Sequence, residues 1–143
     1  MISPICLGVA ERALELSVDY ARTRQQFGKP IGSFQMIQAK LAEMYVALES
    51  ARTFVYRVLD ACNSVQERDL GRGRIHKLAA AALFQAAEAG KFVMDEAVQI
   101  HGGSGYMRDT EINRLYRTTK VMEIAAGSQE IRRLIIAGDL LKG

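Results

Sequence analysis

The longest apolar periodicity of the chain runs from Phe34 to Cys62, and it strongly limits the possible folds. Apolar residues recur there at alternating steps of three and four, which is the spacing of one face of a helix. The positions are Phe34, Ile37, Leu41, Met44, Leu48, Ala51, Val55, Val58 and Cys62. A helix of roughly thirty residues is on the order of 45 Å long. Such a regular seam is typical of a helix that packs lengthwise in an antiparallel bundle.

A second helix is predicted ahead of this one. Ser3 and Pro4 form a helix start, a cap residue followed by proline at the first helical position. Apolar residues then continue at the same steps, and the helix is expected to end near Arg24. Residues 27–32 are expected to form a loop, after which Ser33 caps the long helix.

Three more helices are predicted after a polar connector at residues 63–73. An alanine-rich helix spans 75–100, and its small residues allow neighbouring helices to approach closely. A short helix is capped by Asp109 or Thr110, and a last one by Ser128. The expected apolar positions of these last two helices are Ile112, Leu115, Tyr116, Ile131, Leu134, Ile135 and Leu141. The sequence therefore predicts an all-α, up-and-down antiparallel helical bundle.

Composition restricts the classes of function. The 143 residues, 49% of them hydrophobic, suffice for one domain with a buried core. The net charge of +3 is spread among acidic residues, whereas nucleic-acid binding usually needs a clustered basic stripe. Cys6 and Cys62 are interpreted as small core residues of a protein in a reducing compartment. No apolar run is long enough for a membrane span, so a soluble, cytoplasmic protein is expected.

The stretch from Gln99 to Gly105 is the most distinctive local feature. Gly102, Gly103 and Gly105 directly follow the alanine-rich helix. A glycine there can end the helix with a positive φ angle, in which case the stretch is a helix C-cap followed by a flexible loop. Alternatively, the exposed backbone N–H groups allow a flat or phosphorylated ligand to approach closely. The stretch is not a dinucleotide-binding fingerprint, because that motif opens a helix and this one closes a helix.

Few side chains suggest chemistry by spacing alone. A di-iron centre in a bundle needs Glu-x-x-His pairs, and neither His76 nor His101 has a glutamate three residues before it. Arg24 lies where the first helix ends. Its guanidinium can hold a phosphate bidentately, or it can interact with the helix C-terminus. Phe27 and Phe34 are interpreted as core or packing residues.

Three blocks of the sequence resemble, in the right order, the acyl-CoA dehydrogenase family. The blocks are Arg24-Gln-Gln-Phe-Gly-Lys-Pro-Ile-Gly-Ser-Phe-Gln35, Gln99-Ile-His-Gly-Gly-Ser-Gly-Tyr106 and Gly127-Ser-Gln-Glu-Ile-Arg-Arg133. The resemblance covers residues 1–143 as the C-terminal α-helical domain of that family. It implies that the N-terminal helical domain and the middle β-domain are absent from this chain.

The resemblance implies that the cofactor is FAD. In the family, the residues matching Arg24 and Gln35 contact FAD bound mainly by a neighbouring subunit, and the segment matching 99–103 completes the partner's cofactor site. Residues matching the start of the last helix touch the flavin of the same subunit. The implied cofactor-binding residues are Arg24, Gln26, Gln35, Gln99, Ile100, His101, Gly102, Gly103, Ser128, Gln129 and Glu130.

The implied substrate is an acyl-CoA, with Gly127 close to its thioester. Many members of the family have a glutamate at the position of Ala126, where it removes the α-proton; alanine cannot accept a proton. A branch that includes the isovaleryl-CoA dehydrogenases uses a glutamate at the start of the first helix instead. That position would fall just ahead of Met1, so no catalytic base is expected within this chain.

By resemblance, the reaction is the α,β-desaturation of an acyl-CoA thioester in fatty acid or branched-chain amino acid catabolism. The implied partners are an electron-transferring flavoprotein and further copies of the chain in a dimer or tetramer. The implied compartment is the bacterial cytoplasm or the mitochondrial matrix. The alternative is a non-catalytic helical subunit that completes the flavin site of another chain.

Overall fold

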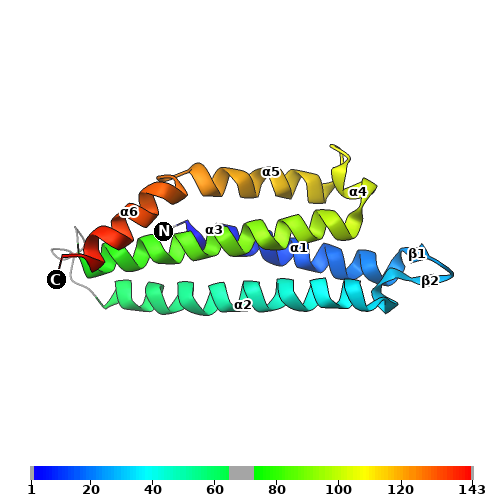
Figure 1. Ribbon diagram of the computed structural model, residues 1–143, viewed down its shortest axis with the longest axis horizontal. Helices are drawn as coiled ribbons and strands as arrows, with labels where there is room; N and C mark the ends of the chain where they lie inside the picture. Colours follow the sequence, from blue (N-terminus) through cyan, green and yellow to red (C-terminus); the bar gives the residue numbers. More distant parts are fainter. Residues whose placement is uncertain (1, 65–72, 143) are drawn as a thin grey trace.

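The computed structural model describes residues 2–64 and 73–142, and helices make up nearly all of these residues (Figure 1). The elements are α1 (Ser3–Thr23), β1 (Gln25–Gln26), β2 (Lys29–Pro30), the 3-10 helix η1 (Ile31–Ser33), α2 (Gln35–Asn63), α3 (Arg74–His101), α4 (Gly103–Tyr106), α5 (Glu111–Ile124) and α6 (Gln129–Leu140). The all-α prediction is confirmed. Most of the predicted connector at 63–73 lies outside the described residues. Among the described helices, none combines the length and the apolar character needed to cross a membrane.

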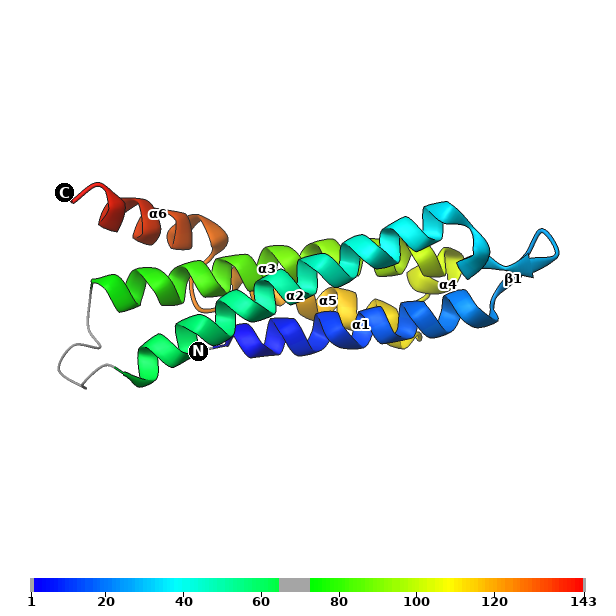
Figure 2. The same cartoon turned by 90° about the horizontal axis from the view of Figure 1, so that it is seen from below.

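Helix α3 is the centre of the bundle. It contacts α1 and α2, and also α4, α5 and α6. Figure 1 shows α2 on one side of α3 and α5 and α6 on the other, and Figure 2 shows α1 beside α3. Helix α1 also contacts both α2 and α5. Consecutive long helices run in opposite directions, and the view turned by 90° shows that α6 diverges from the bundle at the end where α3 begins (Figure 2). The chain is therefore an up-and-down bundle, as predicted, with one helix in contact with all the others.

The core follows the predicted periodicity of α2 and α3. The buried residues of α2 are Met44, Leu48, Ala51, Val55 and Val58, all of them positions of the predicted seam. The fully buried alanines of α3 are Ala82, Ala86, Ala87 and Ala97. Small side chains allow α1 and α2 to lie close against α3, and the larger residues of α2 fill the space between them. Cys6 is buried and Cys62 half-buried, which agrees with their interpretation as packing residues.

Two of the predicted hydroxyl caps have the right position, since Thr110 and Ser128 are the N-cap residues of α5 and α6, but none of the predicted caps forms a side-chain cap hydrogen bond. Helix α1 begins at Ser3 itself, after Ile2, and the buried Ser3 hydroxyl has no hydrogen-bond partner in the described part of the chain. The Ser33 hydroxyl donates to Pro30 O, and the Thr110 hydroxyl donates to Met107 O. These side chains bond to carbonyl groups three residues back instead of to the first N–H groups of the next helix. Serine and threonine readily form such local bonds in turns.

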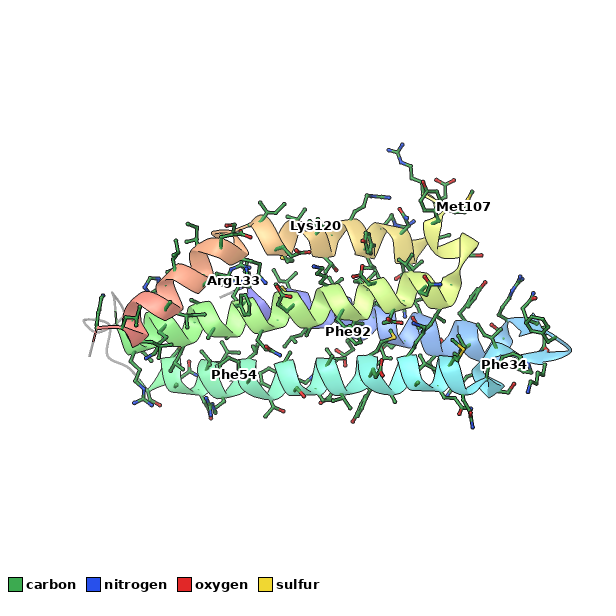
Figure 3. The ribbon with its side chains drawn as sticks, in the orientation of Figure 1. Phe34, Phe54, Phe92, Met107, Lys120 and Arg133 are labelled. Carbon is green, nitrogen blue, oxygen red and sulfur yellow. The ribbon has the colours of Figure 1, made fainter. Side chains whose placement is uncertain are left out.

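The apolar positions expected for the last helix are mostly not buried in α6. Its buried residues are Gln129 and Arg132, whereas Ile131 is 49% exposed and Leu134 is 68% exposed. Leu141, just after the helix, is 85% exposed, and only Ile135 of the expected set is half-buried. Figure 3 shows Arg133 on the side of α6 that lies toward α3. Helix α6 therefore meets α3 through polar side chains and directs most of its apolar residues outward.

Gly105 allows the short helix α4 to fold against the end of α3. A Cβ atom added at Gly105 would lie 2.6 Å from Val98 O and 3.1 Å from His101 Cβ, and real side chains do not come so close to a carbonyl oxygen. Glycine is required here because a side chain would clash with α3. The backbone conformation does not require it, since the φ angle is not in the left-handed region. It fixes the direction in which the chain leaves α3.

We expect Gly105→Ala to lower the free energy of unfolding by about 1–3 kcal/mol, the usual range for overpacking. Chemical denaturation followed by circular dichroism measures the change. Gly103→Ala is the matched control, because a Cβ at Gly103 meets no atom within 4 Å. Equal stability of the two variants would contradict the packing role of Gly105.

Candidate functional site

A short hairpin follows α1, with the predicted site residue Gln26 on its first strand and Arg24 directly before it. Gln25 pairs with Pro30 and Gln26 with Lys29, and the two-residue turn between them has φ angles of 52° at Phe27 and 78° at Gly28. Positive φ at both central positions matches the right-handed twist of a hairpin. The turn places Arg24 and Gln26 beside the end of the bundle, as Figure 1 shows for β1 and β2.

The prediction that Phe27 is a core residue is wrong. Its side chain is 90% exposed at the tip of the hairpin, because the turn extends beyond the ends of the helices. Its one aromatic contact is an edge-on arrangement with Phe34, with ring centroids 6.0 Å apart. Phe34 is half-buried against the core, and the Lys29 ammonium lies 4.5 Å from its ring centroid. Phe34 therefore has the predicted packing role, and Phe27 is an exposed apolar side chain.

Two neighbouring pockets occupy this end of the molecule. One has a volume of about 870 Å³ and includes Gln26, Gln35 and Gln99 in its lining. The other has a volume of about 270 Å³ and lies between α1, the hairpin and the glycine stretch. Its predicted lining residues are Arg24, Gln26, Ile100, His101, Gly102 and Gly103. Gln26 and Ile100 line both pockets, so the structure gathers the first eight predicted site residues at one place.

The glycine stretch is only partly an open strip of backbone. Gly102 ends α3 with a φ angle of 55°, as predicted for a glycine cap. Gly103 is the first residue of the single turn of α4, and Gly105 is the buried residue of that turn. Cβ atoms added at Gly102 or Gly103 would meet nothing within 4 Å. The accessible backbone is therefore restricted to Gly102 and Gly103, beside the smaller pocket.

His101 is held in one tautomer at the rim of that pocket. Its Nδ1 lies 2.7 Å from Ala97 O, and because a carbonyl only accepts, Nδ1 carries the proton. The imidazole stacks on the Tyr20 ring with centroids 4.4 Å apart. Burial lowers the pKa of His101, and the hydrogen bond to Ala97 partly opposes that effect. The neutral ring then has Nε2 as a hydrogen-bond acceptor.

Arg24 is exposed, and no carboxylate within residues 2–64 and 73–142 forms an ion pair with it. Its backbone is fixed at both ends, because its N–H donates to Tyr20 O and its carbonyl accepts from the N–H of Ile31. The guanidinium is thus available beside the smaller pocket. A planar guanidinium with free donors is suited to an anion such as a phosphate.

The other predicted residues lie at a separate place. Ser128 precedes α6, and Gln129 donates to Phe84 O and to the Glu88 carboxylate of α3. Glu88 is twelve residues before Ile100, which corresponds to about 18 Å along the helix. Ser128, Gln129 and Glu130 are therefore not brought together with the hairpin pockets. Gln129 is 4% exposed as a whole residue and its side chain is already bonded to α3, so the accessible neighbours at this place are Ser128 and Glu130.

The turn before α6 has an unusual backbone. Ala126 and Gly127 both have positive φ angles, 55° and 89°. Ala126 is exposed and has no acidic group of its own. The Glu130 carboxylate interacts with the Ser128 hydroxyl and with its own backbone N–H, and both lower its pKa. This end of α6 is thus compatible with an electron-rich ligand at the backbone, but it offers no general base at Ala126.

The described residues contain no group of three metal-ligating side chains. His76 is exposed on the first turn of α3.

The comparisons with known proteins identify the family. Residues 1–141 match the model of the acyl-CoA dehydrogenase C-terminal domain. The chain belongs to the acyl-CoA dehydrogenase family. Over 137 residues it is 43% identical to mitochondrial isovaleryl-CoA dehydrogenase of Oryza sativa subsp. japonica, covering 95% of this chain and 32% of that protein. The chain thus spans about a third of the length of the relatives that it matches.

Solved structures agree with this assignment. Butyryl-CoA dehydrogenase from Megasphaera elsdenii superposes with a TM-score of 0.86 and 37% identity, over 99% of this chain and 35% of that one. The FAD complex of PigA superposes with a TM-score of 0.86 and 28% identity, over 99% of this chain and 36% of that one. The family resemblance inferred from three sequence blocks is therefore confirmed.

Some residues of this acyl-CoA dehydrogenase domain were not predicted as site residues although they line the pockets. Tyr20 and Ser104 line the smaller pocket, and Lys40 lines the larger one. Lys40 also forms an ion pair with Glu96 of α3. Tyr20 has the spacing of a core residue of α1, so no sequence signal distinguishes it. Its stacking on His101 depends on the tertiary contact between α1 and α3.

The lowered pKa of His101 predicts a pH effect on stability. Because the folded state disfavours the proton, the unfolded chain binds it more readily, and the free energy of unfolding falls as the pH drops below about 6.5. We expect His101→Gln to flatten the dependence between pH 7.5 and 5.5, measured by urea denaturation. His76→Gln is the control and should leave that dependence in place. A steep dependence that persists in His101→Gln would contradict the assignment.

Proposed function

We propose that this chain is the C-terminal domain of an FAD-dependent acyl-CoA dehydrogenase that desaturates acyl-CoA thioesters. The main support is the gathering of Arg24, Gln26, Gln35 and residues 99–103 around two adjoining pockets, although they are far apart in sequence. The family match over residues 1–141 supports the same function. The N-terminal helical and middle β-domains would be supplied by other parts of the enzyme.

The residues of the hairpin end fit the diphosphate of FAD. Arg24 has a free guanidinium, and the backbone at Gly102 and Gly103 is open to close approach. Gln26, Gln35 and Gln99 supply amide groups for polar parts of the cofactor, and Ile100 covers an apolar part. His101 presents an acceptor nitrogen toward ribose or ribityl hydroxyl groups. When bound, the flavin accepts the β-hydride of the acyl group, and an electron-transferring flavoprotein would then remove the electrons.

The residues at the hairpin pockets and those at the start of α6 form two clusters, which are too far apart to contact one compact group. Their separation of about 18 Å along α3 agrees with contacts to two different flavins. In this proposal the hairpin end would serve FAD bound by a neighbouring subunit. Residues 128–130 would serve the flavin of the same subunit, with Ser128 and Glu130 accessible to it and Gln129 holding this end of α6 against α3. The exposed apolar residues of α6 would be covered in a dimer or tetramer.

The acyl-CoA would approach the turn at Gly127, where the backbone is free of a side chain. Proton abstraction requires a carboxylate within hydrogen-bond reach of the α-carbon, and Ala126 cannot provide one. We propose that the base is the glutamate used by the isovaleryl-type branch at the start of the first helix, just ahead of Met1. The alanine at position 126 is the observation that supports this branch.

The flavin contact at Arg24 can be tested in the assembled enzyme. We expect Arg24→Ala to weaken FAD binding by about 1.5–3 kcal/mol, the range for hydrogen bonds to a charged group. Arg24→Lys should restore binding only in part, since an ammonium lacks the planar fork. Equilibrium dialysis against FAD measures both. Arg22→Ala is the control, because Arg22 is exposed and pairs with Asp19 outside the pockets. Unchanged FAD binding in Arg24→Ala would remove Arg24 from the site.

The source of the base has a separate test. Replacing the proposed upstream glutamate by glutamine should lower turnover by about 10²–10⁴-fold, the usual contribution of a general base, while FAD stays bound. Adding Ala126→Glu should then recover part of the rate, because Ala126 is exposed and its backbone already tolerates a side chain. Stopped-flow reduction of the flavin by isovaleryl-CoA measures the rate. Full activity without the upstream acid would favour the alternative, a non-catalytic subunit serving another chain.

A further inference from the structure

The contact between α6 and the rest of the bundle is made by a buried arginine. Arg132 is 2% exposed, and it is the largest fully buried side chain among the described residues. No carboxylate contacts its guanidinium in the described part of the chain. A buried charge without hydrogen bonds is costly, so neutral acceptors have to replace its solvation. The arrangement of those acceptors indicates what Arg132 does.

The guanidinium bonds to the carbonyl groups that helix α5 leaves free at its end. Nη2 donates to Met122 O at 3.1 Å and to Ala125 O at 2.6 Å. The last carbonyls of a helix have no intrahelical partner, and a cation there also interacts favourably with the helix dipole. Arg132 therefore caps the C-terminus of α5 from the first turns of α6.

The segment held between these contacts is strained. Directly after Ala125 the chain passes through Ala126 and Gly127 with φ angles of 55° and 89°. A left-handed alanine costs of order 1 kcal/mol and persists only where its surroundings impose it. On one side the Arg132 N–H bonds to Ser128 O, and on the other the Arg132 side chain bonds to Ala125 O. The backbone bond is the first ordinary hydrogen bond of α6, so the side-chain bond to Ala125 O is the one that requires an arginine at this position.

The same guanidinium ties the turn to the central helix. Nη1 donates to Gln129 Oε1 at 2.6 Å, and Gln129 Nε2 donates in turn to Phe84 O and Glu88. The Gln129 amide links the Arg132 guanidinium to the Glu88 carboxylate through two hydrogen bonds, without direct contact between the two ions. The turn is consequently fixed relative to α3, and not only to α6.

We infer that Arg132 is a positioning residue for the acyl-CoA substrate: it holds the turn of residues 125–128 so that the Gly127 backbone faces the thioester. This inference rests on the proposed function, which puts the thioester beside Gly127. Arg132 itself is buried and touches neither substrate nor cofactor. Its loss should disturb acyl-CoA binding and leave FAD at the hairpin end in place.

The test compares Arg132→Met and Arg132→Lys in the flavin-loaded dehydrogenase assembly that contains this chain. The substrate is the one among isovaleryl-CoA, butyryl-CoA and glutaryl-CoA that the wild-type assembly turns over fastest. We expect KM to rise at least tenfold in Arg132→Met, with FAD content unchanged. Arg132→Lys should be intermediate, because an ammonium can bond to one of the two carbonyls. Amide exchange of residues 125–128 should be faster in both variants.

Arg114→Met is the matched control. Arg114 Nη1 also donates to a backbone carbonyl, Asp109 O at 3.0 Å, but it is exposed at the opposite end of α5. Its KM should stay within twofold of the wild type. Should Arg132→Met fail to fold, the lysine variant still decides the question, since it keeps the charge and most of the length.

An active wild type with an unchanged KM in the variants would overturn the positioning role. So would a uniform loss of FAD and substrate binding, because that pattern indicates a purely structural residue. A wild-type assembly that binds FAD but turns over none of the three substrates would overturn the proposed function instead. In that case faster amide exchange at 125–128 in the variants would still identify Arg132 as the clamp of the turn, and the assignment to acyl-CoA would fall.

Discussion

The close packing along α3 is the constraint on which the rest of the structure depends. This helix touches every other helix of the described bundle, so its side chains on several faces have to be small. Ala82, Ala86 and Ala97 are fully buried, and they bring the neighbouring backbones near without leaving voids. The same helix sets the positions of both candidate clusters. Its last turn carries His101 beside the hairpin, and Phe84 and Glu88 anchor α6 about 18 Å away along its axis.

Long, regular features of this fold were predictable from sequence, and the features that depend on a single neighbour were not. The seam of α2 was predicted because nine apolar positions agree on one face, so tertiary context has little to change. Helix α6 is short, and only Ile131, Leu134 and Ile135 within it were expected as apolar positions. In the structure the free carbonyls at the end of α5 and the polar groups of α3 favour Arg132 and Gln129 at the contact. Hydrophobic periodicity identifies an apolar face, but not what covers it.

The candidate site shows the same division. Arg24 and Gln26 are close in sequence to each other, but more than seventy residues separate them from Gln99 to Gly103, and no spacing rule joins the two segments. The family resemblance joined them, and the pockets agree with it. Tyr20 could not be found in this way, because its period marks it only as a packing residue of α1. It becomes part of the site through its stacking on His101. The roles of individual residues toward FAD stay predictions.

A glutamate at position 126 would supply both a catalytic base and the backbone of the turn, whereas Ala126 supplies only the backbone. Strained backbone at a functional position can have a catalytic reason, such as the placement of a reactive side chain. Here the side chain is a methyl group, yet the positive φ angles of Ala126 and Gly127 are kept and are held by buried hydrogen bonds. The hydrogen bonds of Arg132 maintain this geometry without a catalytic side chain, so the geometry does not depend on aiming a base. A turn that binds the substrate through its backbone has a reason to keep it, whichever residue removes the proton.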